Sequence, residues 1–261
     1  MPPGVAALGA VVSLAAAVIG LFFTAMVFRL FLERRKPHHV AWTTGLAMFT
    51  AVAIVQVVAE LGGWTDGLFR TWYLLGAGGL VGFLGLGSVY IVNRRAGHGF
   101  AAYVVALFVA FVAATMTAPT DAGIIGSFNE GVPVSGDGWV RGSLPRLLSP
   151  LLNIPAGIAL IGLAVVGLVR YRLTYNGWIA VGATVQALGT GISRFRDALL
   201  ASGIDTASLI YFAELAGIAL MFVGFWKAVE WAKEHRTSAH GGGPPPTRSE
   251  TDQVVADTVP K

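Results

Sequence analysis

Apolar residues gather in seven long runs, separated by short segments that hold most of the charged side chains. Each run approaches the ~20 residues that an α-helix needs to cross a ~30 Å hydrocarbon core, and none alternates as a membrane β-strand would. The pattern therefore predicts an all-α, polytopic membrane protein with seven transmembrane helices. The predicted spans are 5–28, 41–61, 71–92, 100–118, 150–169, 177–193 and 207–226.

The first run is interpreted as a retained span rather than a signal peptide, because its basic residues follow the apolar stretch instead of preceding it. We expect residues 1–236 to form one transmembrane domain with an external loop at 119–149. The end of that loop, 141–148, is expected to lead into the fifth span as an interfacial helix. Residues 237–261 lack apolar content and are expected to form a disordered cytoplasmic tail.

Basic residues are divided unequally between the two sets of loops. Thirteen follow spans one, three, five and seven, whereas five lie in the remaining loops. Because Lys and Arg are enriched on the cytoplasmic side of membrane proteins, this asymmetry predicts an N-terminus outside and a C-terminus in the cytoplasm. The predicted location is the plasma (cytoplasmic) membrane of a bacterium.

The composition agrees with lipid as the surrounding solvent and limits the chemistry. The chain is 55% hydrophobic and 12% charged, whereas a soluble domain carries about 25% charged residues. Its net charge of +4 comes from Lys and Arg at the ends of apolar runs, where they meet lipid headgroups, so no nucleic-acid partner is expected. The sequence has no cysteine, which rules out disulfides, thiolate metal sites and Cys nucleophiles.

Polar residues inside the apolar runs are the candidate functional residues, because each is costly to place in lipid. In the predicted orientation they fall in the outer half of the membrane, where we expect an outward-facing site for a small polar solute or an ion. The candidate ligand or ion site comprises Gln56, Glu60, Tyr73, Asn153, Gln186, Arg194, Tyr211 and Glu214.

Glu214 is the most informative of these residues. It lies ~10 Å along its helix from Ala207, so its carboxylate needs a partner or a proton. Arg194 is the expected partner, whereas Glu60 lies nearer the interface and can be solvated. A structural alternative stays open, in which these side chains form an ion-paired girdle that holds the helices in register at ~0.6 kcal/mol per contact.

Glycines crowd the third run, and Gly78 and Gly82 form a GxxxG pattern. Small residues allow helices to approach closely in lipid. We therefore expect a central, tightly packed helix with Gly78, Gly79 and Gly82 at its contacts, and a dimer face or a mobile hinge is the alternative.

The remaining motifs argue against cofactors and catalysis. All five histidines lie in predicted loops or the tail, so neither haem nor a metal site is expected. Lys227 is the only lysine near span seven and lies ~30 Å from Ala207, too far for a buried retinal Schiff base. No Ser-His-Asp set, HExxH motif or phosphate-binding loop is found, and the chain is not expected to be an enzyme.

Two short segments carry a family resemblance. The segments Trp72-Tyr73-Leu74-Leu75-Gly76-Ala77 and Ser149-Pro150-Leu151-Leu152-Asn153-Ile154-Pro155 resemble a group of uncharacterised seven-span bacterial integral membrane proteins. The resemblance runs from span two to span seven and implies no activity. Sugar and amino-acid transporters with three-plus-one-plus-three helices share the predicted topology, but their Pro-Gln signature is absent from this sequence.

These patterns together predict an integral membrane protein that transports or binds a small solute or ion. The alternative is a non-catalytic sensor or accessory subunit of a membrane complex, which would act as a homo-oligomer or with another membrane partner.

Overall fold

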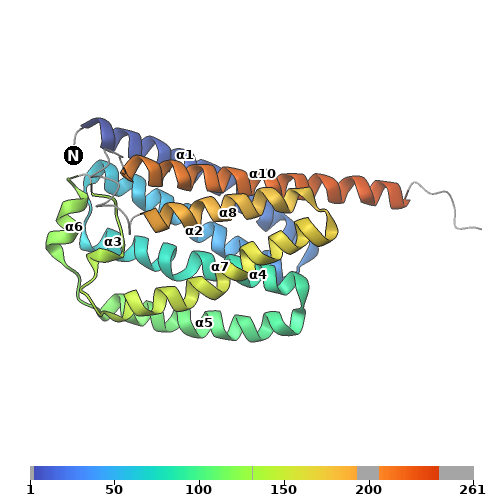
Figure 1. Cartoon of the computed structure of the whole chain (residues 1–261), viewed down its shortest axis with the longest axis horizontal. Coiled ribbons are helices and arrows are strands. Elements are labelled where there is room, and N and C mark those ends of the chain that lie inside the picture. Colours follow the sequence, from blue (N-terminus) through green and yellow to red (C-terminus); the bar gives the residue numbers. More distant parts are fainter. Residues whose placement is uncertain (1–2, 131, 193–205, 241–261) are drawn as a thin grey trace, which may run out of the picture.

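The computed structural model describes residues 3–130, 132–192 and 206–240, and almost all of this part of the chain is helical (Figure 1). The elements in chain order are α1 (Pro3–Arg34), α2 (Pro37–Gly62), α3 (Asp66–Tyr73), the π-helical η1 (Leu74–Leu80), α4 (Val81–Val92), α5 (Arg94–Thr117), α6 (Ala122–Phe128), the 3₁₀-helical η2 (Gly136–Gly138), α7 (Leu144–Tyr171), α8 (Thr174–Ile192) and α10 (Thr206–His240). The prediction of an all-α protein is confirmed.

Six helical stretches are long and apolar enough to cross a membrane, as a multi-pass membrane protein requires. They are Ala7–Arg34, Pro37–Gly62, Asp66–Val92, Arg94–Thr117, Leu144–Tyr171 and Ser208–Ala232, and they coincide with the predicted spans one to five and seven. Helix α8 covers most of the predicted sixth span, 177–193, but is not one of the six. It has 19 residues and includes the polar Asn176, Thr184 and Gln186.

Short turns between the long helices follow from local sequence signals. Helix α2 begins at Pro37, whose missing N–H is harmless in a first turn. It ends at Gly63, whose positive φ of 91° suits glycine and whose N–H donates to the Ala59 carbonyl. These turns make successive long helices antiparallel, so the bundle has two ends. The glutamate end is where α2 finishes near Glu60 and α10 begins, and the arginine end is where α7 finishes, just after Arg170.

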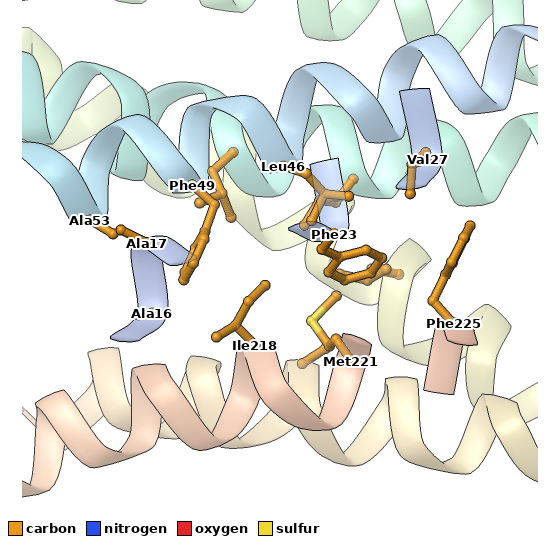
Figure 2. Close-up of a cluster of buried hydrophobic side chains, with 14 residues drawn as sticks. Ala16, Ala17, Phe23, Val27, Leu46, Phe49, Ala53, Ile218, Met221 and Phe225 are labelled. Carbon is orange, nitrogen blue, oxygen red and sulfur yellow. The ribbon is translucent and has the colours of Figure 1, made fainter. Parts of the chain in front are cut away.

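Six long elements pack in a ring in the order α1, α2, α4, α7, α8 and α10, and α10 contacts α1 again. Helix α5 lies outside this ring, against α4 and α7 (Figure 1). Figure 2 shows side chains of α1, α2 and α10 that point toward one another at the centre, among them Phe23, Phe49 and Ile218. Because lipid is as apolar as these side chains, close packing rather than escape from water holds this core together.

The segment 141–148 does not form a separate interfacial helix, which corrects the prediction. Helix α7 begins at Leu144 and continues through Pro150 and Pro155 to Tyr171. Pro155 has no N–H and therefore frees the Leu151 carbonyl four residues earlier. The Tyr103 hydroxyl of α5 donates to this carbonyl at 2.5 Å. A neighbouring helix thus satisfies the freed acceptor, which explains why the helix can continue inside the membrane.

The third span is one helical stretch interrupted by the π-helical η1. Gly78, Gly79 and Gly82 lie in or beside this interruption and are buried. An added Cβ would meet the ring of Phe111 at Gly78, the thioether of Met48 at Gly79 and the side chain of Leu152 at Gly82. The glycines therefore admit side chains from α5, α2 and α7, so this stretch packs closely against three neighbours.

The loop at 119–149 is folded onto the glutamate end. Residues from α6 and just after η2 pack with α3, with α5 and with the turn between α2 and α3. This aromatic cap consists of Trp64, Phe69, Tyr73, Phe111, Phe128 and Trp139. The Arg70 guanidinium donates to the carbonyls of Thr115 and Ala118, and its Cζ lies 5.2 Å from the centre of the Trp139 ring. These contacts fix the loop against the ends of the spans.

At the other terminus, α10 continues to His240, so residues 237–240 are helical and do not belong to a disordered tail as predicted. The rest of that predicted tail, residues 241–261, lies outside the described residues.

Candidate functional site

Two carboxyl groups and their partners meet near the glutamate end. The Tyr211 hydroxyl of α10 donates a hydrogen bond to Oε1 of Glu60, which belongs to α2. Helix α1 contacts both of these helices. An added Cβ at Gly9 of α1 would lie 3.1 Å from the Tyr211 ring and 3.2 Å from Glu60 Cδ. A glycine at this position leaves room for the hydrogen bond between the two neighbours of α1.

A second pair lies one helical turn deeper. The Gln56 side chain hydrogen-bonds the Glu214 carboxyl, and Gln56 is only 2% exposed. Gln56 and Glu60 are four residues apart on α2, and Tyr211 and Glu214 are three apart on α10, so each pair shares a helix face. We call Gln56, Glu60, Tyr211 and Glu214 the carboxyl site.

Ser13 of α1 is a further candidate that sequence reasoning missed. Its side chain is 3% exposed, and its Oγ has no hydrogen-bond partner within the described part of the chain. It lies one turn after Gly9 on α1, on the same side of the helix. The available signal was a lone hydroxyl in a run of Ala, Val and Leu. A buried polar atom without a protein partner is a place where water or a ligand can bind.

Gln186 of α8 borders the carboxyl site. An added Cβ at Gly217 would lie 3.2 Å from Gln186 Cδ. Gly217 follows Glu214 by three residues on α10, so the Gln186 amide and the Glu214 carboxyl lie over neighbouring turns of one helix. Helices α1, α2, α8 and α10 therefore all bring polar side chains to this part of the bundle.

Two predicted site residues lie elsewhere. Tyr73 belongs to the aromatic cap, where its ring stacks on Phe111 at 5.8 Å. Asn153 of α7 donates to the Ala77 carbonyl in η1 at 2.7 Å, and Ser149 donates to the same carbonyl at 3.2 Å. A π-helix alters the backbone hydrogen-bond pattern, and these two side chains supply donors to its Ala77 carbonyl. Asn153 thus supports the third span.

Arg194, the predicted partner of Glu214, lies outside the described residues. The partner that the structure shows for Glu214 is the neutral Gln56. Ion pairs between described residues occur instead in the cap region, at Arg70–Asp66 and Arg146–Asp137. The predicted ion-paired girdle is therefore not seen at the carboxyl site within the part of the chain that the structure describes.

The carboxyl site consists of side chains whose oxygen atoms can act as cation ligands. Two carboxyls, an amide, a phenol and the nearby Ser13 hydroxyl offer the oxygen ligands that hard cations prefer. The same groups can also accept and pass protons. Residues 3–130, 132–192 and 206–240 contain no group of three or more His, Cys, Asp or Glu side chains placed to hold a metal ion.

His38, His39 and His98 lie near the starts of α2 and α5 and not in loops, which corrects the prediction. His38 and His39 pack ring to ring at 4.3 Å, and Tyr90 lies 3.2 Å from Nδ1 of His98. Each of these three histidines therefore contacts a residue that is close to it in the sequence.

No protein-family description matches the chain, and no curated protein or solved structure shows significant similarity to it.

Proposed function

We propose that the chain is a seven-span protein of a bacterial cytoplasmic membrane that transports a small monovalent cation, H⁺ or Na⁺, at the carboxyl site. The observation that carries this proposal is that Glu60 and Glu214, on two different helices, each pair with a neutral hydrogen-bond donor. In this proposal α8 is the sixth span, and the glutamate end faces outward.

The physical argument starts from the cost of acidic groups in a bundle surrounded by lipid. An ionised carboxylate loses much of its hydration there and is stable only beside a proton, a cation or strong donors. A tyrosine hydroxyl and a glutamine amide each supply a hydrogen bond but no positive charge. Within the part of the chain that the structure describes, these two pairs, one turn apart, leave negative charge that a small cation or a proton can neutralise.

Ser13 supports the same proposal from a third helix. Its buried hydroxyl has no partner in the described structure. A hydroxyl oxygen that is already desolvated is suited to coordinate a cation or a bound water. Gly9, four residues before Ser13 on the same side of α1, lies against Tyr211 and Glu60.

The proposal is tested with the purified full-length protein in sealed vesicles that trap a pH-sensitive dye. Proton entry under an imposed membrane potential and uptake of radioactive Na⁺ are both measured. The wild-type protein should exceed protein-free vesicles in at least one assay. Glu60→Gln and Glu214→Gln should both return that flux to background, because each keeps the side-chain shape and removes the charge.

The matched control is Glu33→Gln, which removes an exposed carboxylate at the opposite end of α1. This variant should keep wild-type flux. Wild-type vesicles that are indistinguishable from protein-free vesicles for both cations would overturn the proposal. So would Glu60→Gln and Glu214→Gln proteins that fold and retain full flux.

A further inference from the structure

A separate cavity of about 510 Å³ lies inside the helix ring toward the arginine end. Its wall comes from α1, α2, α4, α7, α8 and α10, so it occupies the centre of the ring. It begins beside the core residues Phe23, Leu46 and Met221, which Figure 2 draws at the centre of the bundle. None of the carboxyl-site residues lines it, and the proposed cation chemistry does not use it.

The wall of this cavity is mainly apolar. Leu84, Leu160, Leu163 and Ala164 contribute aliphatic surface, and Phe23 and Phe225 contribute rings. Two polar groups in the wall are already satisfied by one backbone carbonyl. Trp42 Nε1 donates to the Leu84 carbonyl at 3.1 Å, and the Ser88 hydroxyl donates to the same oxygen at 3.3 Å. A space with this lining favours a hydrocarbon occupant over water.

The cavity reaches the outer surface of the bundle between α4 and α7, which pack against each other. Ile91, Val92 and Val166 line the cavity and are also 54%, 66% and 46% exposed. Exposed aliphatic residues on a membrane helix face acyl chains. The cavity is therefore open beside the arginine-end parts of α4 and α7, where acyl chains surround the bundle.

A positive charge marks the same opening. Arg170 and Tyr171, at the end of α7, also line the cavity, and the Arg170 Cζ lies 5.9 Å from the centre of the Tyr171 ring. Arg170 is exposed, so its guanidinium can meet a headgroup. Arginine binds phosphate with two parallel N–H donors, which gives both strength and orientation.

We propose that this cavity binds one acyl chain of an anionic phospholipid, whose phosphate contacts Arg170 at the mouth. The volume falls within the range of about 300–1,000 Å³ that is usual for small-molecule sites. The apolar wall accepts the chain, the opening lined by Ile91, Val92 and Val166 admits it, and Arg170 selects the charge of the headgroup. The lipid fills the ring centre at the end opposite the carboxyl site.

The test uses the full-length protein in phosphatidylcholine nanodiscs that contain a trace of phosphatidylglycerol with a photoreactive acyl chain. After illumination, the labelled residues are located by peptide mass spectrometry. Labelling should concentrate on residues 84–92 and 160–171. Extra phosphatidylglycerol should compete with it, whereas extra phosphatidylcholine should compete at least about tenfold less well, as expected for one lost charge-assisted contact. Free oleate, which has a carboxylate but no phosphate, should also compete less well than phosphatidylglycerol.

Two matched pairs of variants separate the cavity from ordinary surrounding lipid. Ala164→Phe fills the cavity, whereas Val109→Phe adds the same ring on the exposed face of α5. Arg170→Gln removes the charge at the mouth, whereas Arg172→Gln removes a neighbouring charge that does not line the cavity. We expect Ala164→Phe to abolish cavity labelling and Arg170→Gln to weaken competition by phosphatidylglycerol about tenfold. The two controls should behave as wild type.

If Ala164→Phe does not fold, Ala228→Phe fills the same space from α10. The proposal is overturned if labelling spreads equally over the exposed face of α5, or persists in the folded cavity-filled protein. It is also overturned if phosphatidylcholine competes as well as phosphatidylglycerol, because Arg170 would then select no headgroup charge. Equal competition by oleate would overturn it too, because the site would then take a fatty-acid carboxylate rather than a phospholipid.

Discussion

The Tyr211 hydroxyl of α10 reaches Glu60 of α2 beside Gly9 of α1, so three helices separated widely in sequence define one polar contact. Tyr211 is 5% exposed, and it packs against Val12 and Leu215. The contact is therefore held by packing on one side and by the hydrogen bond on the other.

This contact predicts energetic coupling between the two residues. Tyr211→Phe removes the donor and Glu60→Gln weakens the acceptor, while both variants keep the approximate shape. A double-mutant cycle on unfolding in mixed micelles should give a coupling of about 0.6–1.7 kcal/mol, the range of measured polar contacts between membrane helices. If the two substitutions change the unfolding free energy additively, this hydrogen bond does not contribute to stability.

Ser13→Ala should separate function from stability. Its buried hydroxyl has no partner in the described structure, so removing it should change the unfolding free energy by less than about 0.5 kcal/mol. Cation flux should nevertheless fall about fivefold, because one oxygen contact of ~1 kcal/mol is lost from the bound state. Ser88→Ala is the control, since that hydroxyl donates to Leu84 and lies away from the carboxyl site. Unchanged flux in Ser13→Ala would remove Ser13 from the site.

Tyr103→Phe should destabilise the pairing of α5 with α7. The lost hydroxyl leaves the Leu151 carbonyl, which Pro155 has already freed, without its donor. An unsatisfied carbonyl in an apolar setting costs about 1–3 kcal/mol. The measurement is the free energy of unfolding of the two proteins in the same micelles. Restoring a backbone donor with Pro155→Ala should recover part of the loss, and no recovery would count against this explanation.

Gly85→Ala should be far more harmful than Gly162→Ala, although both add one methyl group inside a span. At Gly85 the new Cβ would lie against the Ala156 carbonyl oxygen and 2.7 Å from its Cα, and backbone cannot rotate away as a side chain can. The expected cost is about 1–3 kcal/mol. At Gly162 nothing lies within 4 Å, so that variant should be neutral or gain up to about 1 kcal/mol from helix propensity. The measurement is thermal unfolding of the two purified variants. Equal losses of stability would contradict the prediction.

Single cysteines test the proposed orientation, because the natural chain has none. Gly126→Cys lies in α6 at the glutamate end, and Gly99→Cys lies in α5 at the arginine end, with open space at both positions. An impermeant maleimide should label Gly126→Cys in intact cells and Gly99→Cys only after the membrane is opened. The reverse pattern would place the carboxyl site on the cytoplasmic side.

The long helices could be predicted from the sequence because membrane insertion depends on the composition of about 20 consecutive residues. Such a local property needs no knowledge of distant contacts. The same reasoning began the fifth span at Pro150, whereas α7 begins at Leu144. Nor could it show that the Leu151 carbonyl, which Pro155 frees, meets its donor in Tyr103 of another helix. It also missed η1, whose Ala77 carbonyl is supported by Ser149 and Asn153 of α7.

The sequence predicted which polar residues were candidates for the site, but not which of them lie together. Gln56, Glu60, Tyr211 and Glu214 meet, whereas Tyr73 and Asn153 serve the aromatic cap and the third span. Spacing along one helix shows which residues share a face, but it does not show which neighbour that face meets. The order of helices around the ring decides this, and packing between distant segments sets that order. Apolar length alone therefore determined that the chain forms membrane helices, and only tertiary packing decided which of their polar side chains share a site.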